Sequence, residues 1–159
     1  MAAFCLHGLN PTEFSEFFKW DDAALAARQM QRVVATSASG FPCRVSLVDA
    51  GVGEDLLLLS YQHQSADSPY RAAGPIFVRR GAVAAVLAVD EVPRQILRRL
   101  MSLRAYDAGH RIIAAEICEG EDVAAWLASR FEEASVAYIH LHFARYGCYA
   151  CRADRACAG

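Results

Sequence analysis

The sequence predicts an α+β fold, in which a mostly antiparallel sheet carries a few helices packed against it. Short apolar segments of strand length recur along the chain, and turn residues such as Gly, Ser and Asp separate them, which is typical of an antiparallel meander. Segments with helix-cap chemistry or helical periodicity are fewer. The length of 159 residues predicts a single globular domain over residues 1–159.

The N-terminal half opens with a predicted strand over residues 4–9. Asn10 is placed to cap a helix, with Pro11 in the first turn and Glu13 in the position that bonds back to the cap. A second short helix is expected over residues 21–27. Three strands should follow, over residues 32–36, 43–48 and 56–61.

The middle of the chain begins with a long polar segment, residues 62–75, which contains two prolines and is predicted to be a loop. A strand over residues 76–80 and an apolar element over residues 82–89 are expected next. Residues 92–101 have the periodicity of an amphipathic helix, with an inward face formed by Ile96, Leu97 and Leu100.

The C-terminal part is predicted to form a hairpin, with strands over residues 103–106 and 112–118 on either side of a turn that Asp107 caps. A helix over residues 122–133 and a strand over residues 136–143 follow, and a compact, cysteine-rich tail begins at residue 145. The prediction of an α+β class rests on this mixture of strands and helices.

Composition excludes several functions. The 16 basic and 18 acidic residues give a net charge of −2, which argues against general nucleic-acid binding and against a polybasic membrane patch. Eight residues form the longest apolar run, whereas a membrane-spanning helix needs about 20. No signal peptide is visible, so a cytoplasmic protein with reduced thiols is expected. A hydrophobic content of 55% permits a homodimer without requiring one.

The richest chemistry lies near the C-terminus, where strand alternation places His140 and His142 on one face. Cys148 and Cys151 follow with the two-residue gap that lets two thiolates share a metal ion or form a disulfide. The leading hypothesis is therefore a metal site formed by these four residues, holding zinc or, as the less favoured choice, iron.

Two alternatives stay open for this cluster. In the first, Cys148 and Cys151 cycle between dithiol and disulfide, aided by neighbouring arginines. In the second, the protein is a non-enzymatic binding module, and the cluster is structural: the histidines make hydrogen bonds and the cysteines fill apolar space. The remaining thiols are interpreted as such fillers: Cys5, Cys43, Cys118 and Cys157.

A second candidate site lies in and beside the polar loop, where Tyr61, His63 and Gly74 accompany three further polar residues. Ser68, Tyr70 and Arg71 supply a hydroxyl, a phenol and a guanidinium that could hold the carboxylate or phosphate of a small anionic ligand. A solvated loop with a surface ion pair is the alternative interpretation. No residue pattern indicates a catalytic triad, a paired-carboxylate site or a nucleotide-binding loop, so the reaction and any catalytic residues stay unassigned.

Several motifs resemble a family of short uncharacterised bacterial proteins, a domain of unknown function of about this length. The resemblance covers nearly the whole chain, and its carriers are Phe41–Arg44, Leu58–Tyr61, Ser68–Arg71, Gly74–Val78, Ser102–Asp107, Tyr138–His142 and Gly147–Arg152. The last two, a His-x-His followed by Gly-Cys-aromatic-x-Cys-Arg, are the most specific. In the family Asn often follows the second His, where this chain has Phe143. The resemblance implies a bacterial origin, and it implies that the polar loop and the C-terminal cluster belong to one recurring design, which favours a shared site.

Overall fold

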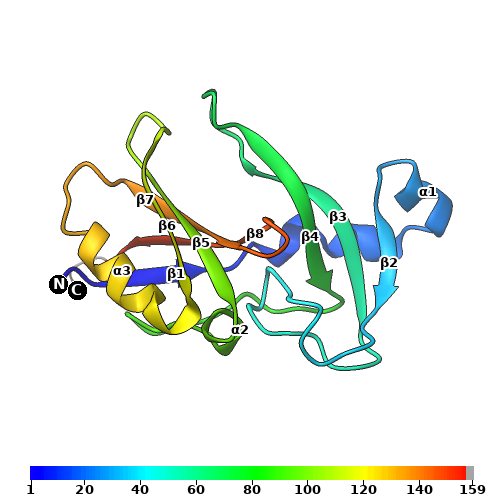
Figure 1. Ribbon diagram of the computed structural model, residues 1–159. Coiled ribbons are helices and arrows are strands. Elements are labelled where there is room, and N and C mark those ends of the chain that lie inside the picture. Colours follow the sequence, from blue (N-terminus) through cyan, green and yellow to red (C-terminus); the bar gives the residue numbers. More distant parts are fainter. Residues whose placement is uncertain (157–159) are drawn as a thin grey trace.

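Two antiparallel sheets form the framework of the protein in the computed structural model, which describes residues 1–156 (Figure 1). The larger sheet has the strand order β1-β8-β7-β5-β6 and the smaller one has the order β2-β3-β4. All pairings between these named strands are antiparallel. The predicted α+β class is therefore confirmed.

The larger sheet consists of β1 (Phe4–His7), β5 (Leu100–Tyr106), β6 (Ile112–Glu119), β7 (Tyr138–Phe143) and β8 (Tyr149–Arg155). Every residue of the central strand β7 is buried. Ile139 and Leu141 point into an apolar core, which α3 (Val123–Arg130) covers with Val123 and Leu127. Because side chains alternate along a strand, the opposite face of β7 carries its polar residues.

The smaller sheet consists of β2 (Gln31–Val34), β3 (Asp55–Gln64) and β4 (Ala72–Arg79). Leu57, Leu59 and Ile76 pack with Phe14 and Leu25 into a second apolar core. The turn between β3 and β4 lies at the same end of the molecule as the turn between β5 and β6 (Figure 1). A hydrogen bond from Ser68 Oγ to the His110 carbonyl, 2.9 Å long, joins the two turns.

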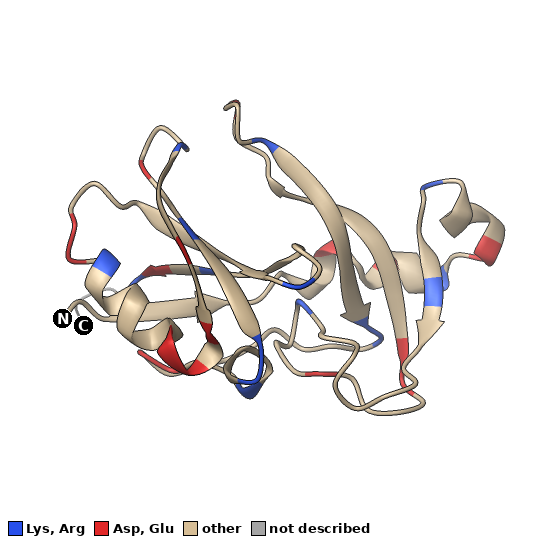
Figure 2. Ribbon diagram, in the orientation of Figure 1, with Lys and Arg blue, Asp and Glu red and all other residues tan. Residues whose placement is uncertain are grey.

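The helices are short: η1 (Pro11–Glu13), η2 (Ser15–Lys19), α1 (Asp22–Ala26), α2 (Arg94–Leu97), η3 (Gly120–Asp122) and α3. The predicted cap at Asn10 is confirmed, because its side chain accepts a hydrogen bond from the Thr12 amide. None of the helices among residues 1–156 has the length and apolar character needed to span a membrane. Acidic and basic residues are interspersed over both sheets (Figure 2).

Four predicted elements differ from the structure. Residues 43–48 form turns and isolated bridges around the buried Arg44 instead of a strand. Residues 82–89 have no regular structure, and their exposed valines have no sheet partner. The helix expected over residues 92–101 covers only α2, because the chain enters β5 at Leu100. The loop over residues 62–75 is shorter than predicted, since pairing between β3 and β4 extends to Gln64 and Ala72.

Candidate functional site

The polar face of the larger sheet gathers residues from neighbouring strands. Tyr106 lies opposite Tyr138, Arg104 opposite His140, and Ser102 opposite His142 in the β5–β7 register. Residues directly opposite one another in antiparallel strands share a face of the sheet. His140 and His142, predicted from strand alternation to lie on one face, thus share that face with Arg104.

A third histidine reaches this face from the smaller sheet. The His63 ring on β3 lies 4.9 Å from the His142 ring and 6.2 Å from the His140 ring, between centroids. It also stacks on the Tyr149 ring, with centroids 5.4 Å apart and planes 11° apart. We call His63, His140 and His142 the imidazole cluster. His63 thus brings β3 into contact with His142 and Tyr149.

Each member of the imidazole cluster has one buried ring nitrogen without a hydrogen-bond partner in the part of the chain that the structure describes: His63 Nδ1, His140 Nδ1 and His142 Nε2. His142 Nδ1 lies 3.0 Å from the Gly147 carbonyl oxygen. A carbonyl oxygen only accepts, so Nδ1 carries the hydrogen, and the unpartnered Nε2 of the neutral ring has a free lone pair. Unpartnered buried polar atoms are uncommon in native proteins and mark candidate binding sites.

Burial and positive charge keep these imidazoles neutral. Burial, followed by the neighbouring His142 and His63 rings, lowers the pKa of His140 from 6.5 to about 3. Burial is also the main cause that lowers the pKa of His142 to about 3, and the Arg104 charge adds to it. The pKa of His63 is lowered by burial and then by Arg104. At neutral pH the cluster therefore carries no charge of its own.

Arg104 is the charged residue that β5 contributes to this face, opposite His140. Its side chain is half-buried, and it makes no hydrogen bond or ion pair with any residue from 1 to 156. Arg152, which lies opposite His140 on β8, is held by both carboxylate oxygens of Asp154. The face thus presents one guanidinium without a counter-charge beside three neutral imidazoles, which is a favourable surrounding for an anion.

The polar loop is tied to the same region through Tyr138. The Tyr138 hydroxyl accepts a hydrogen bond from Gln64 Nε2 at 2.9 Å and lies 2.8 Å from His110 Nδ1. The Tyr106 ring stacks on the Tyr138 ring, with centroids 5.0 Å apart. His110 is held in the left-handed backbone region, at a φ of 62°, in the turn that Asp107 caps as predicted. This network fixes one border of the polar face.

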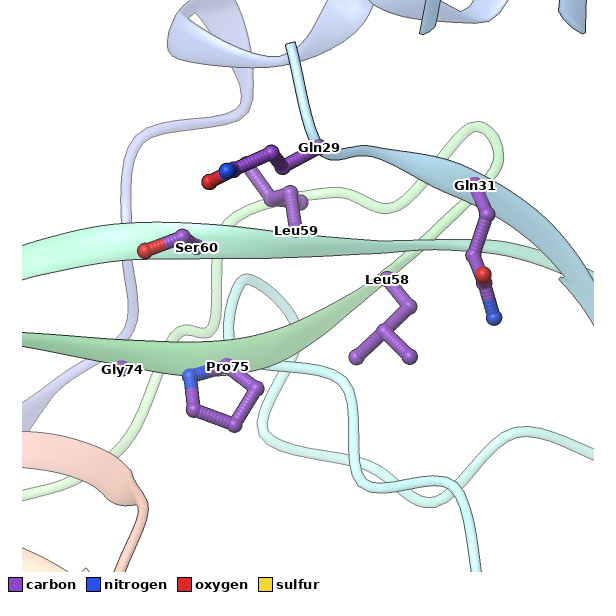
Figure 3. A pocket seen from close by; sticks show the side chains of 7 residues that line it. All are labelled: Gln29, Gln31, Leu58, Leu59, Ser60, Gly74 and Pro75. Carbon is purple, nitrogen blue, oxygen red and sulfur yellow. The ribbon is translucent and has the colours of Figure 1, made fainter. Parts of the chain in front are cut away.

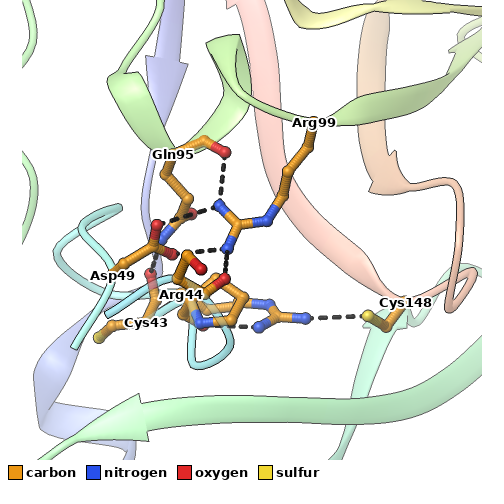
Figure 4. Close-up of polar contacts among 8 residues, drawn as sticks. Cys43, Arg44, Asp49, Gln95, Arg99 and Cys148 are labelled. Atoms are coloured by element: carbon orange, nitrogen blue, oxygen red, sulfur yellow. Dashed lines mark hydrogen bonds and ion pairs between the residues drawn. The ribbon is translucent and has the colours of Figure 1, made fainter. Parts of the chain in front are cut away.

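The four predicted metal ligands are not brought together. Cys151 is fully buried and lies opposite Leu141, in the apolar core on the other side of the sheet from His140 and His142. Cys148 accepts a hydrogen bond from the guanidinium of Arg44 over 3.0 Å (Figure 4). Within residues 1–156, no group of three or more His, Cys, Asp or Glu side chains is arranged to hold a metal ion.

The predicted anion-binding residues lie along the β3–β4 turn. Ser68 Oγ bonds to the His110 carbonyl and to the Tyr70 amide, so it holds the turn. The Tyr70 ring is half-exposed and lies 6.4 Å from the Tyr106 ring. Arg71 is exposed, and its binding role stays a prediction. Sequence reasoning missed Arg104 as a site residue, although its alternation with Tyr106 on one strand was the available signal.

A separate pocket lies on the smaller sheet, next to the end of β2. Figure 3 shows its lining, which contains two amides and a hydroxyl above apolar side chains but no ionisable group: Gln29, Gln31, Leu58, Leu59, Ser60, Gly74 and Pro75. Without an ionisable group this pocket can neither bind a charged ligand through an ion pair nor transfer a proton. It is therefore a weaker candidate for a functional site than the imidazole cluster.

Comparison with known proteins identifies one family that matches the part of the chain carrying these residues. The family described as "Protein of unknown function (DUF1203)" matches residues 40–155, a segment that contains the imidazole cluster and Arg104. Searches of curated proteins and of solved structures returned no match. The predicted resemblance to an uncharacterised family is confirmed, whereas the bacterial origin and cytoplasmic location stay predictions.

Proposed function

We propose that this chain, which belongs to the DUF1203 family of unknown function, binds a small anionic molecule between Arg104 and the imidazole cluster. The single observation that carries the proposal is the unpaired, half-buried guanidinium of Arg104 beside three neutral imidazoles with unpartnered nitrogens. A ligand anion would supply the missing counter-charge and hydrogen-bond partners at once. The protein would then act as a binding module, the class that the sequence analysis left open.

The electrostatics of the face favour an anion over a metal cation. Burial is the main cause that lowers the pKa of His140, His142 and His63, and the positive charge of Arg104 adds to it; the same charge would oppose a divalent ion at their nitrogens. Cys151 is also out of reach on the core side of β8. The predicted zinc or iron site therefore has less support than anion binding. Measuring the metal content of the same sample tests it directly.

The experiment is a titration of the full chain with inorganic phosphate at pH 7, followed by amide and imidazole NMR signals. We expect saturable shifts centred on His63, Arg104 and His142, and we expect Arg104→Met to weaken phosphate binding by about ten-fold or more. Arg98→Met is the matched control, because Arg98 is an exposed arginine at the end of α2.

Two results would contradict the proposal. Equal phosphate affinities in the parent and in Arg104→Met would remove Arg104 from any binding role. About one zinc or iron ion per chain in protein purified without chelator, lost in His63→Phe, would replace anion binding by the metal hypothesis.

A further inference from the structure

We infer that the anion bound at this site carries a hydrogen-bond donor of its own, a hydroxyl that donates to His142 Nε2. The ligand class is then a small hydroxycarboxylate or a phosphate that retains an O–H. This inference rests on the proposed function and deepens it, because Arg104 alone would accept any anion.

The first step is the fixed tautomer of His142. Its Nδ1 faces the Gly147 carbonyl oxygen at 3.0 Å, which places the ring hydrogen on that nitrogen. His142 is 1% exposed, and its Nε2 has no hydrogen-bond partner among the described residues. A neutral ring held in this way offers a lone pair and no hydrogen on Nε2, so its partner must be a donor.

The second step is the position of this lone pair relative to the charge. Arg104 lies opposite His140 and Ser102 lies opposite His142, so Arg104 and His142 are diagonal neighbours on one face. Diagonal neighbours are within reach of one small molecule when one side chain is as long as arginine. The charge of Arg104 also acts on His142, where it adds to burial, the main cause that lowers the pKa of His142. One ligand can therefore meet both groups.

The third step concerns the anions that this site would bind poorly. An anion without an O–H group would place oxygen lone pairs against the lone pair of His142 Nε2, leaving this buried atom unsatisfied. Sites built to hydrogen-bond a hydroxyl discriminate strongly against analogues that lack it. In the free protein the ring is not protonated at neutral pH, because burial, with the Arg104 charge adding to it, lowers the pKa of His142 to about 3.

The experiment compares matched pairs of anions on the full chain at pH 7 by NMR titration. Phosphate retains an O–H and sulfate does not, while phosphate is no more negatively charged, so Coulomb attraction alone cannot favour phosphate. Glycolate and acetate form the second pair, with equal charge and one hydroxyl of difference. We expect the hydroxyl-bearing member of at least one pair to bind about ten-fold or more tightly, and the pair that shows it identifies phosphate or carboxylate as the source.

His142→Phe should remove this preference while Arg104 still binds both anions weakly. If that variant does not fold, His142→Gln, whose amide oxygen can accept, should keep part of the preference. Equal affinities within both pairs for the parent would overturn the inference and leave the proposed function standing. Absence of binding by all four anions would instead count against the proposed function itself.

Discussion

Arg44 donates a hydrogen bond to Cys148 Sγ across 104 positions of sequence, over 3.0 Å. The Arg44 side chain is 1% exposed, and it also donates to the carbonyl oxygens of Tyr149 and Pro42. It thereby joins the segment before β3 to the first residues of β8. Cys148 is held by this contact and packs against the apolar core of the larger sheet.

Arg44 should accordingly be one of the most sensitive positions for stability. Arg44→Leu removes three hydrogen bonds, two of them to buried carbonyl oxygens that would be left unsatisfied, so we expect the free energy of unfolding to fall by about 3–5 kcal/mol. Urea denaturation measures it. Arg98→Leu, an exposed substitution, should change stability by less than about 0.5 kcal/mol, and similar losses in both variants would contradict the assigned role of Arg44.

These long-range contacts mark the limit of what the sequence could predict. The alternation along β7 correctly placed His140 and His142 on one face, and the cap at Asn10 was readable because it is a local interaction. The approach of His63 to His142 depends on how the two sheets meet, which no local pattern encodes. The same reason explains the error at residues 43–48, where the burial of Arg44 overrides strand periodicity.

The buried histidines should make stability depend on pH. The pKa of His140 and His142 is about 3 in the folded protein and 6.5 in an ordinary setting, so between these values the unfolded chain binds more protons. The contribution of these two imidazoles to the free energy of unfolding should therefore have its full value above pH 6.5. It should decrease as the pH falls toward 3. The slope is about 1.4 kcal/mol per pH unit for each imidazole.

Urea denaturation at pH 7, 6 and 5 tests this dependence. His140→Phe should have a shallower decrease in stability than the parent, because one of the two imidazoles no longer takes up a proton on unfolding. Carboxylates contribute to both proteins equally, so the difference between the two pH profiles isolates His140. Parallel profiles would show that His140 is not held neutral by the fold.

Cys151 should be inert in the folded protein. It is fully buried, and burial raises the pKa of its thiol to about 12, so very little thiolate exists at neutral pH. We expect iodoacetamide to leave Cys151 unmodified in the native state, whereas the half-buried Cys5 reacts. Mass spectrometry of digested protein reads out each site. Rapid labelling of Cys151, or a Cys148–Cys151 disulfide under mild oxidation, would instead revive the thiol-redox hypothesis.

Gly120 should tolerate no side chain, because η3 and α2 pack there with their backbones in close approach. A Cβ at this position would overlap the Ile96 carbonyl oxygen and lie 2.7 Å from Leu97 Cα, and backbone atoms cannot yield as a flexible side chain can. We expect Gly120→Ala to lower the free energy of unfolding by about 2 kcal/mol or more.

Gly74→Ala is the matched control for Gly120→Ala, since nothing lies within 4 Å of the position that its Cβ would occupy. It should change stability by less than about 1 kcal/mol, in either direction, because the added methyl meets no neighbour and restricts only the unfolded chain. Urea denaturation of both variants gives the comparison. If Gly120→Ala were as stable as Gly74→Ala, α2 and η3 could not pack as closely as described.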